Sequence, residues 1–366
     1  MTSLFESHKS APAVVQAAGM KGFAAEFQNL DHYIRVITDR IWEGRRIDDI
    51  RLYYSDPCVV ETAMSVSTSI EDVITGTRAT LAMFPDRRLL AEDVIQSGDA
   101  ENGFLSSHRI ISTMTHLGDG NFGSATGRKI HARTIADCVC KDNRIVHEWL
   151  VRDHAAIALQ IGTTPKALAQ LWLTQRDGWH KPVAGPAPAG YVSHISTDPL
   201  AVRYAQAIAD MAGVAGGSTR HVAGDAKGKR SGRIAACVAS TYDEAAQQIG
   251  PGESTCYGRA EISAFWQGLF GSLQVEHLAI EHLALQRDMP QTGRCDRLAL
   301  RFRAKTVVSP RPDSIIRYEC NSNQIPGRSI ELMGIVHSEL IHGRVIREWV
   351  LIDDVAIWMQ ILTPQA

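Results

Sequence analysis

The chain has 366 residues, which at roughly 150 residues per domain predicts two domains. Apolar residues make up 45% and charged residues 21%, close to the average of globular proteins, so the composition excludes a disordered chain. With 38 Lys and Arg against 40 Asp and Glu, the net charge of −2 argues against a nucleic-acid-binding face. No apolar run reaches the roughly 18 residues of a membrane helix, and the first residues lack the layout of a secretory signal. We therefore expect a cytoplasmic protein with neither nucleic-acid nor membrane partners.

The seven cysteines are scattered and odd in number, which is not the pattern of a disulfide framework. Cys138 and Cys140 form a C-x-C pair whose thiols would share one face of a strand. No second Cys or His pair follows at zinc-binding spacing, so we expect buried apolar side chains and no metal site.

Residues 1–27 precede the first regular pattern and are interpreted as an N-terminal extension. A first domain over 28–162 begins with an amphipathic helix at 30–42, and a second helix opens near Gly76. Strand-like segments follow at 88–95 and 104–115, and two long strands joined by a tight turn close the domain.

Residues 163–197 combine a short helical piece with a Pro- and Gly-rich stretch, which predicts a linker. The second domain, 198–366, repeats the same order, starting with a helix at 199–211. A Gly- and Lys-rich loop from Ala212 is inserted where a small helix and strand are expected. That loop lacks the GKS or GKT of a phosphate-binding loop, so we interpret it as solvated.

The two domains are copies of each other. The 36 residues from Gly127 and the 36 from Gly327 align without a gap and are identical at 12 positions, against two or three expected by chance. A period of 200 residues is too long for a solenoid and indicates a duplicated domain. Helices collected at one end of sequentially connected strands predict an α+β fold.

The closing segment RIVHEWLVRDHAAIALQIG resembles that of the SnoaL-like polyketide cyclases, in the nuclear transport factor 2-like superfamily. RIWEGRRIDDI, YYSDPCVV and MFPDRRLLAEDVIQSGD fit the same family pattern in order. The resemblance implies two tandem cones, each a curved antiparallel sheet with helices on one face and a small-molecule pocket between them. It also implies sheet-to-sheet dimers, so the tandem chain is expected to form an intrachain pseudo-dimer, with further homo-oligomers left open.

By motif position, the resemblance places a catalytic acid–base on Asp153 in the first domain. Its counterpart Asp353 is the weaker candidate of the two. Strand alternation puts Asp153 on one face with Ile145, His147, Trp149 and Val151, where an apolar pocket would raise its pKa. The alternative is structural, because Asp153 precedes a helical segment and aspartate is a preferred N-cap.

Further pocket candidates share strand faces in the first domain. They are His108 on one strand and His131, Arg133 and Asp137 on the next, with Trp149 as a pocket wall and Trp349 as its counterpart. Glu148 and Glu348 fall on the opposite face, where we expect exposed ion pairs. The polar set is absent from the second copy, so the first cone is the expected site.

Two functions stay open. One is a cofactor-free cyclase, isomerase or dehydratase acting by acid–base chemistry on a polyketide-like or other carbonyl substrate. The other is a non-catalytic protein of the same fold that binds a small ligand or serves as a scaffold.

Overall fold

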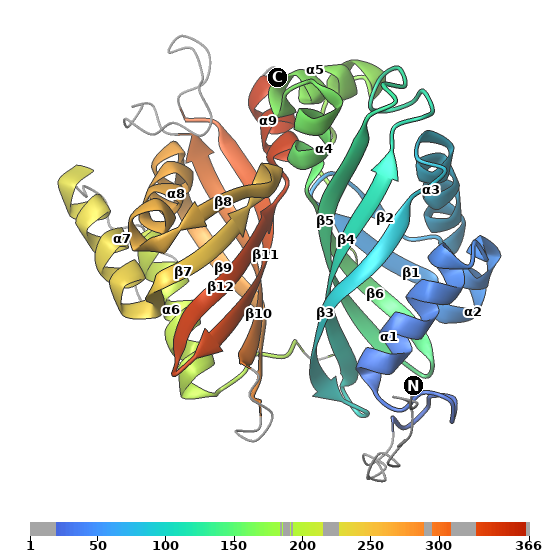
Figure 1. The fold of residues 1–366 in the computed structure, drawn as a ribbon, viewed down its shortest axis with the longest axis horizontal. Helices are drawn as coiled ribbons and strands as arrows, with labels where there is room; N and C mark the ends of the chain where they lie inside the picture. Colours follow the sequence, from blue (N-terminus) through green and yellow to red (C-terminus); the bar gives the residue numbers. More distant parts are fainter. Residues whose placement is uncertain are drawn as a thin grey trace, which may run out of the picture.

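The computed structural model describes residues 20–183, 185, 191, 193–214, 227–288, 295–308 and 327–363. The described chain forms two units, each with a six-stranded sheet and helices on one side of it. This confirms the predicted α+β class and the tandem arrangement. The two sheets stand back to back, and the helices cover their outer faces (Figure 1).

The first unit begins with helical elements that cover the sheet. In chain order its elements are α1 (Leu30–Thr38), η1 (Asp39–Glu43), η2 (Ile47–Asp49), α2 (Ile50–Tyr53), β1 (Tyr54–Thr62), β2 (Val66–Ser67), α3 (Ile70–Met83), β3 (Arg88–Asp99), β4 (Gly103–Thr115), β5 (Lys129–Lys141), β6 (Arg144–Arg152) and α4 (His154–Ile161). Asn29 and Ser69 cap α1 and α3, each accepting a backbone N–H from the first turn. These caps and the buried apolar stripe of α1 are local features that the sequence carries.

Helix α5 (Pro165–Gln175) leads from the first unit toward the second. The second unit contains α6 (Pro199–Ala212), α7 (Lys227–Thr241), β7 (Tyr242–Gly250), η3 (Pro251–Glu253), β8 (Ser254–Tyr257), α8 (Gly258–Ser272), β9 (Leu273–Gln286), β10 (Asp296–Val308), β11 (Ser329–Ile341), β12 (Arg344–Ile352) and α9 (Asp354–Leu362). The expectation that a loop replaces a helix and strand here is wrong, because α7 and β7 occupy those places. The rest of that loop, 215–226, lies outside the described residues.

The strand orders β2-β1-β6-β5-β4-β3 and β8-β7-β12-β11-β10-β9 are the same in both units. Most neighbours are antiparallel, as expected, but β1 runs parallel to β6 and β7 parallel to β12. Each sheet is therefore mixed. The parallel pair is possible because β1 and β6 are joined by a long crossover that contains α3 and four strands, β2 to β5, rather than by a hairpin.

Most positions identical in the two copies hold equivalent backbone contacts. The side-chain amides of Gln160 and Gln360 connect α4 and α9 to β5 and β11, at the backbone of His131 and Glu331. Arg144 donates to the carbonyl of Tyr54, and Arg344 makes the equivalent contact with the carbonyl of Tyr242. Many of the positions that are identical in the two copies therefore connect one element of a unit to another.

The inner sheet faces bury a shared apolar cluster that includes Trp149 and Val151 from β6 and Ile335 and Leu351 from the second unit. Helices α4, α5 and α9 gather at one end of the molecule, where α5 packs on α9 (Figure 1). The two units therefore pack sheet to sheet within one chain, with the helices of each unit on the side that faces away from the other.

Candidate functional site

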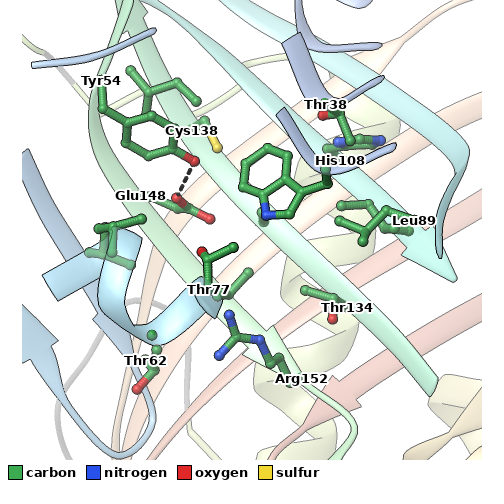
Figure 2. Close-up of a pocket in the computed structure, with 18 of the residues that line it drawn as sticks. Thr38, Tyr54, Thr62, Thr77, Leu89, His108, Thr134, Cys138, Glu148 and Arg152 are labelled. Carbon is green, nitrogen blue, oxygen red and sulfur yellow. Dashed lines mark hydrogen bonds between the residues drawn. The ribbon is translucent and has the colours of Figure 1, made fainter. Parts of the chain in front are cut away.

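A cavity of about 260 Å³ lies in the first unit, between the outer face of the sheet and the helices α1 and α3. Its wall is largely apolar, with Ile34 and Ile37 of α1 and Trp42 of η1. A few polar side chains interrupt it, which is the usual make-up of a small-molecule site. The polar residues deepest in the sheet are Tyr54, His108, Thr134, Cys138, Glu148 and Arg152 (Figure 2).

Glu148 is a buried carboxyl group on the cavity wall. Its Oε2 accepts a hydrogen bond of 3.0 Å from the hydroxyl of Tyr54, the contact drawn in Figure 2. Burial raises the pKa of Glu148 above its usual value, although the Tyr54 hydroxyl and the charge of Arg152 act in the opposite direction. A carboxyl group with a raised pKa can exchange a proton with a ligand near neutral pH. Glu148 therefore has the properties of a general acid–base.

His108 stands on β4 as a neutral imidazole. Burial, helped by the charges of Arg35 and Arg109, lowers its pKa to about 3. Its Nε2 is buried and has no hydrogen-bond partner among the residues that the structure describes. A buried polar nitrogen without a partner is costly, so this atom is available to a ligand or water.

The second unit keeps the glutamate but fills the space around it. Glu348, the counterpart of Glu148, is fully buried and accepts four hydrogen bonds. Its donors are Tyr204, Tyr242, Gln248 and Ser338. Two strand positions account for two of the three additional donors, because Val60 and Cys138 stand in the first unit where Gln248 and Ser338 stand in the second. The third, Tyr204, comes from α6.

The other polar positions of the cavity have apolar counterparts. Strand register matches His108, Ile110 and Thr134 with Leu300, Phe302 and Gly334, and the 200-residue offset matches Arg152 with Ile352. The ring of Phe302 lies against Gly334, where an added Cβ would be only 2.4 Å from a ring carbon. The second unit thus has an aromatic ring where the first unit has space.

Two expected pocket residues, Trp149 and Asp137, lie instead on the inner face, between the units. Trp149 stacks under the guanidinium of Arg301, with 3.7 Å between Cζ and the ring centroid. The equivalent contact joins Trp349 to Arg109 at 3.4 Å. Asp137 is fully buried and accepts hydrogen bonds from Arg301 and Ser107 and from the imidazole of His282. The structure therefore differs from the expectation that these side chains face the cavity.

Asp153 and Asp353 occupy the same interface. Asp153 caps α4 through the N–H of Ala156 and also accepts the N–H groups of Gly252 and Glu253 in η3 of the second unit. Gly252 has a φ of 78°, which lets the tight turn aim these N–H groups at the carboxylate. Asp353 caps α9 and contacts His154 at 2.7 Å. Neither aspartate lines the cavity, and both match the capping alternative.

Burial is the largest influence on Asp153 and raises its pKa to about 6, against the effect of the backbone donors. Because the folded pKa is above the ordinary 3.8, the folded state holds this proton more tightly than the unfolded state. The associated stability is present below pH 4 and is lost as the pH rises through about 6.

We expect Asp153→Asn to remove that decline, which is on the order of 3 kcal/mol for a shift of this size. Urea unfolding at pH 4, 5, 6 and 7 measures it. A variant whose stability falls with pH as steeply as that of the wild type would contradict the assignment.

The remaining candidates are separated from one another. His108 lines the cavity as expected, whereas His131 is exposed. Arg133 is held by Glu92 and Glu253, and its backbone region borders a smaller cavity of about 60 Å³. The structure therefore does not bring His108, His131, Arg133 and Asp137 together.

Sequence reasoning missed Glu148 and Arg152 for one physical reason. Alternation along β6 separates Glu148, Leu150 and Arg152 from Trp149 and Val151. The sequence predicts the pocket on the second of these faces, because that face is the more apolar one. In the structure both faces are buried, and the more apolar one packs on the other unit. A bulge at Val146 also moves Ile145 to the cavity side. The sequence did contain one indication of this site, because a glutamate stands at the same position in both copies, as Glu148 and Glu348.

Two general properties of the described residues complete the description. No helix among them is long and apolar enough to cross a membrane. Within the same residues, no three His, Cys, Asp or Glu side chains form a group that could hold a metal ion. Cys138 and Cys140 are free thiols and buried, as expected.

A comparison with protein-family models gave a match to the first unit. Residues 32–161 match the model of the SnoaL-like polyketide cyclases, which confirms the resemblance for this part of the chain. The second unit repeats the same strand order. A comparison with curated proteins gave no match.

Solved structures that resemble the chain have the length of one unit. IdmH, a putative polyketide cyclase from Streptomyces antibioticus, is 21% identical, with 36% of this chain and 98% of IdmH covered and a TM-score of 0.32. AclR, a putative hydroxylase from Streptomyces galilaeus, is 18% identical over 37% of this chain and 98% of its own, with a TM-score of 0.33. A SnoaL-like polyketide cyclase from Agrobacterium tumefaciens is 19% identical over 37% and 98%, with a TM-score of 0.31.

Proposed function

We propose that the protein is a cofactor-independent enzyme that performs acid–base chemistry on a carbonyl substrate in the first unit, as in a cyclisation, isomerisation or dehydration. The observation that carries the proposal is the carboxyl group of Glu148, buried beside an open cavity and hydrogen-bonded to a single tyrosine. A cytoplasmic location and further homo-oligomers stay predictions.

Glu148 replaces Asp153 as the proposed base, because a base must reach the proton that it removes. In the proposed reaction Glu148 takes a proton from the carbon next to the carbonyl group and returns it to a carbon or oxygen of the product. Burial and the neighbouring Glu148 raise the pKa of Tyr54 well above its usual value, so its hydroxyl stays protonated. Its single proton is donated to Oε2 of Glu148, so Oε1 is the oxygen of Glu148 that takes up the substrate proton.

For the second unit we propose a structural role. The four hydrogen bonds to Glu348 and the ring of Phe302 support it, because they occupy the place of a ligand. The non-catalytic alternative thus applies to this unit, whose sheet covers the inner face of the first.

The experiment is exchange of the α-protons of 2-tetralone with D2O, followed by NMR. The double variant Ile110→Phe with Thr134→Gly transplants the pair Phe302 and Gly334 into the first unit. We expect the wild type to accelerate exchange and the double variant to reduce it to the uncatalysed rate. Because the second unit folds with this pair, the variant blocks the cavity without introducing a new kind of packing. Equal rates in both proteins would refute a catalytic cavity in the first unit.

A further inference from the structure

Two arginines at the inner end of the first-unit cavity have no carboxylate partner among the described residues. Arg152 projects from β6 into the cavity (Figure 2). Neither a hydrogen bond nor an ion pair joins it to any residue in the described part of the chain. Its side chain keeps an exposed surface although protein surrounds it, because that surface faces the cavity. The charge of Glu148 acts to raise the pKa of Arg152, but the two side chains form no ion pair.

Arg87 is the second of these arginines. Within the described part of the chain its guanidinium donates only to the hydroxyl of Ser112, at 3.1 Å from Nη2 and 3.3 Å from Nε. Burial, followed by the positive charges of Arg152 and Arg45, lowers its pKa to about 9. With its pKa at about 9, Arg87 stays charged at neutral pH, and the positive charge of Arg152 opposes that charge.

The two guanidinium groups stand where two cavities meet. Arg87 and Arg152 line both the main cavity and the adjoining one of about 60 Å³. Two positive charges that stand close together repel each other, and an anion that binds between them lessens that repulsion. The fold does not need a cation on β6, because Ile352 takes the same place in the second unit.

We propose that the first-unit cavity binds an organic anion whose apolar body lies along the Ile34 and Ile37 side, with its carboxylate between Arg87 and Arg152. Guanidinium groups bind carboxylates with directed, charge-assisted hydrogen bonds. The carboxylate offsets one of the two positive charges, which lessens their mutual repulsion, and it is held at the opposite end of the polar wall from Tyr54. It leaves the carbonyl-bearing part of the ligand to Glu148. The proposal rests on the proposed function, since it assigns the substrate class of the same site.

The test compares 2-naphthoate with its uncharged amide, 2-naphthamide, by isothermal titration of the full chain. The two ligands have nearly the same shape and differ in charge. We expect the wild type to bind naphthoate at least about tenfold more tightly, the range of one charge-assisted hydrogen bond. Arg152→Ile, which installs the second unit's own residue, is expected to bring the preference below about threefold and leave naphthamide affinity within about twofold.

Arg78→Met is the matched control, because Arg78 lies on α3 outside the cavity and pairs with Asp48 at the surface. It should keep the wild-type preference. Equal binding of the two ligands by the wild type would overturn the anion site and leave the cavity as a ligand site. A preference that survives in both Arg152→Ile and Arg87→Met would also overturn it. Binding of neither ligand would overturn the anion site and the proposed function together.

Discussion

Replacing Glu148 with glutamine is expected to slow the exchange of 2-tetralone α-protons at least about a hundredfold, the lower end of what a general base contributes. Glutamine has the same shape and can still accept the Tyr54 hydroxyl bond, so the cavity keeps its walls. The amide cannot take up a proton. The loss should therefore appear in the rate constant of exchange, with ligand affinity unchanged.

The pH profile gives a second measurement. Because burial raises the pKa of Glu148, the basic form accumulates only above its ordinary value of 4.5. The wild-type rate should rise with pH and level off above that raised pKa, and Glu148→Gln should lack this rise. Asp153→Asn is the control, because Asp153 lies between the units, and its rate should stay within a few-fold of the wild type. A large loss in Asp153→Asn with none in Glu148→Gln would return the role to the aspartate.

Asp137→Asn is expected to lower the free energy of unfolding by about 3 to 5 kcal/mol, the usual cost of breaking a buried charge pair from one side. Burial by itself would raise the pKa of Asp137, but the charges of His282 and Arg301 hold it below its usual value. The asparagine would leave Arg301 buried at the interface, with Glu281 at 3.4 Å as its remaining partner. Urea unfolding at pH 7, followed by tryptophan fluorescence, measures the loss.

The matched control is Asp48→Asn, whose aspartate pairs with Arg78 on the surface and should cost less than about 1 kcal/mol. The sign of the pH dependence is also defined. Since the folded pKa of Asp137 is depressed, its contribution is present above the unfolded value near 3.8 and is lost as the pH falls below it. The difference between wild type and Asp137→Asn should therefore shrink in acid. Equal losses in Asp137→Asn and Asp48→Asn would show that the network does not hold the units together.

The Asp137 network links the units through defined donors and acceptors. Ser107 donates to Asp137, so its oxygen accepts from Nε2 of His337, and Nδ1 of His337 then accepts from Arg109. The arrangement assigns the tautomer of a neutral imidazole. Burial, together with the charge of Arg109, lowers the pKa of His337 well below its usual value, which agrees with that form.

Much of the fold could be predicted because it depends on local patterns. Twelve identities over 36 residues established the duplication, and the positions behind them, such as Gln160 and Gln360, make the same contacts in both units. The capping role of Asp153 could likewise be predicted, because an N-cap is recognised from the helical segment that directly follows it in the sequence. The parallel pairing of β1 with β6 could not be predicted, since no local sequence pattern in either strand identifies its partner.

The sequence by itself determined that the chain carries two copies of an α+β unit and that the first copy holds the more polar set. Only the tertiary structure decided which face of β6 contains the site. Alternation separates Glu148 and Arg152 from Trp149 and Asp153, but it does not say which set meets a cavity. In an isolated unit, the more apolar face of the strand would be expected to line the pocket. Here the second unit covers the inner face of the sheet, so the apolar set packs between the two sheets, and Glu148 and Arg152 line the cavity on the outer face.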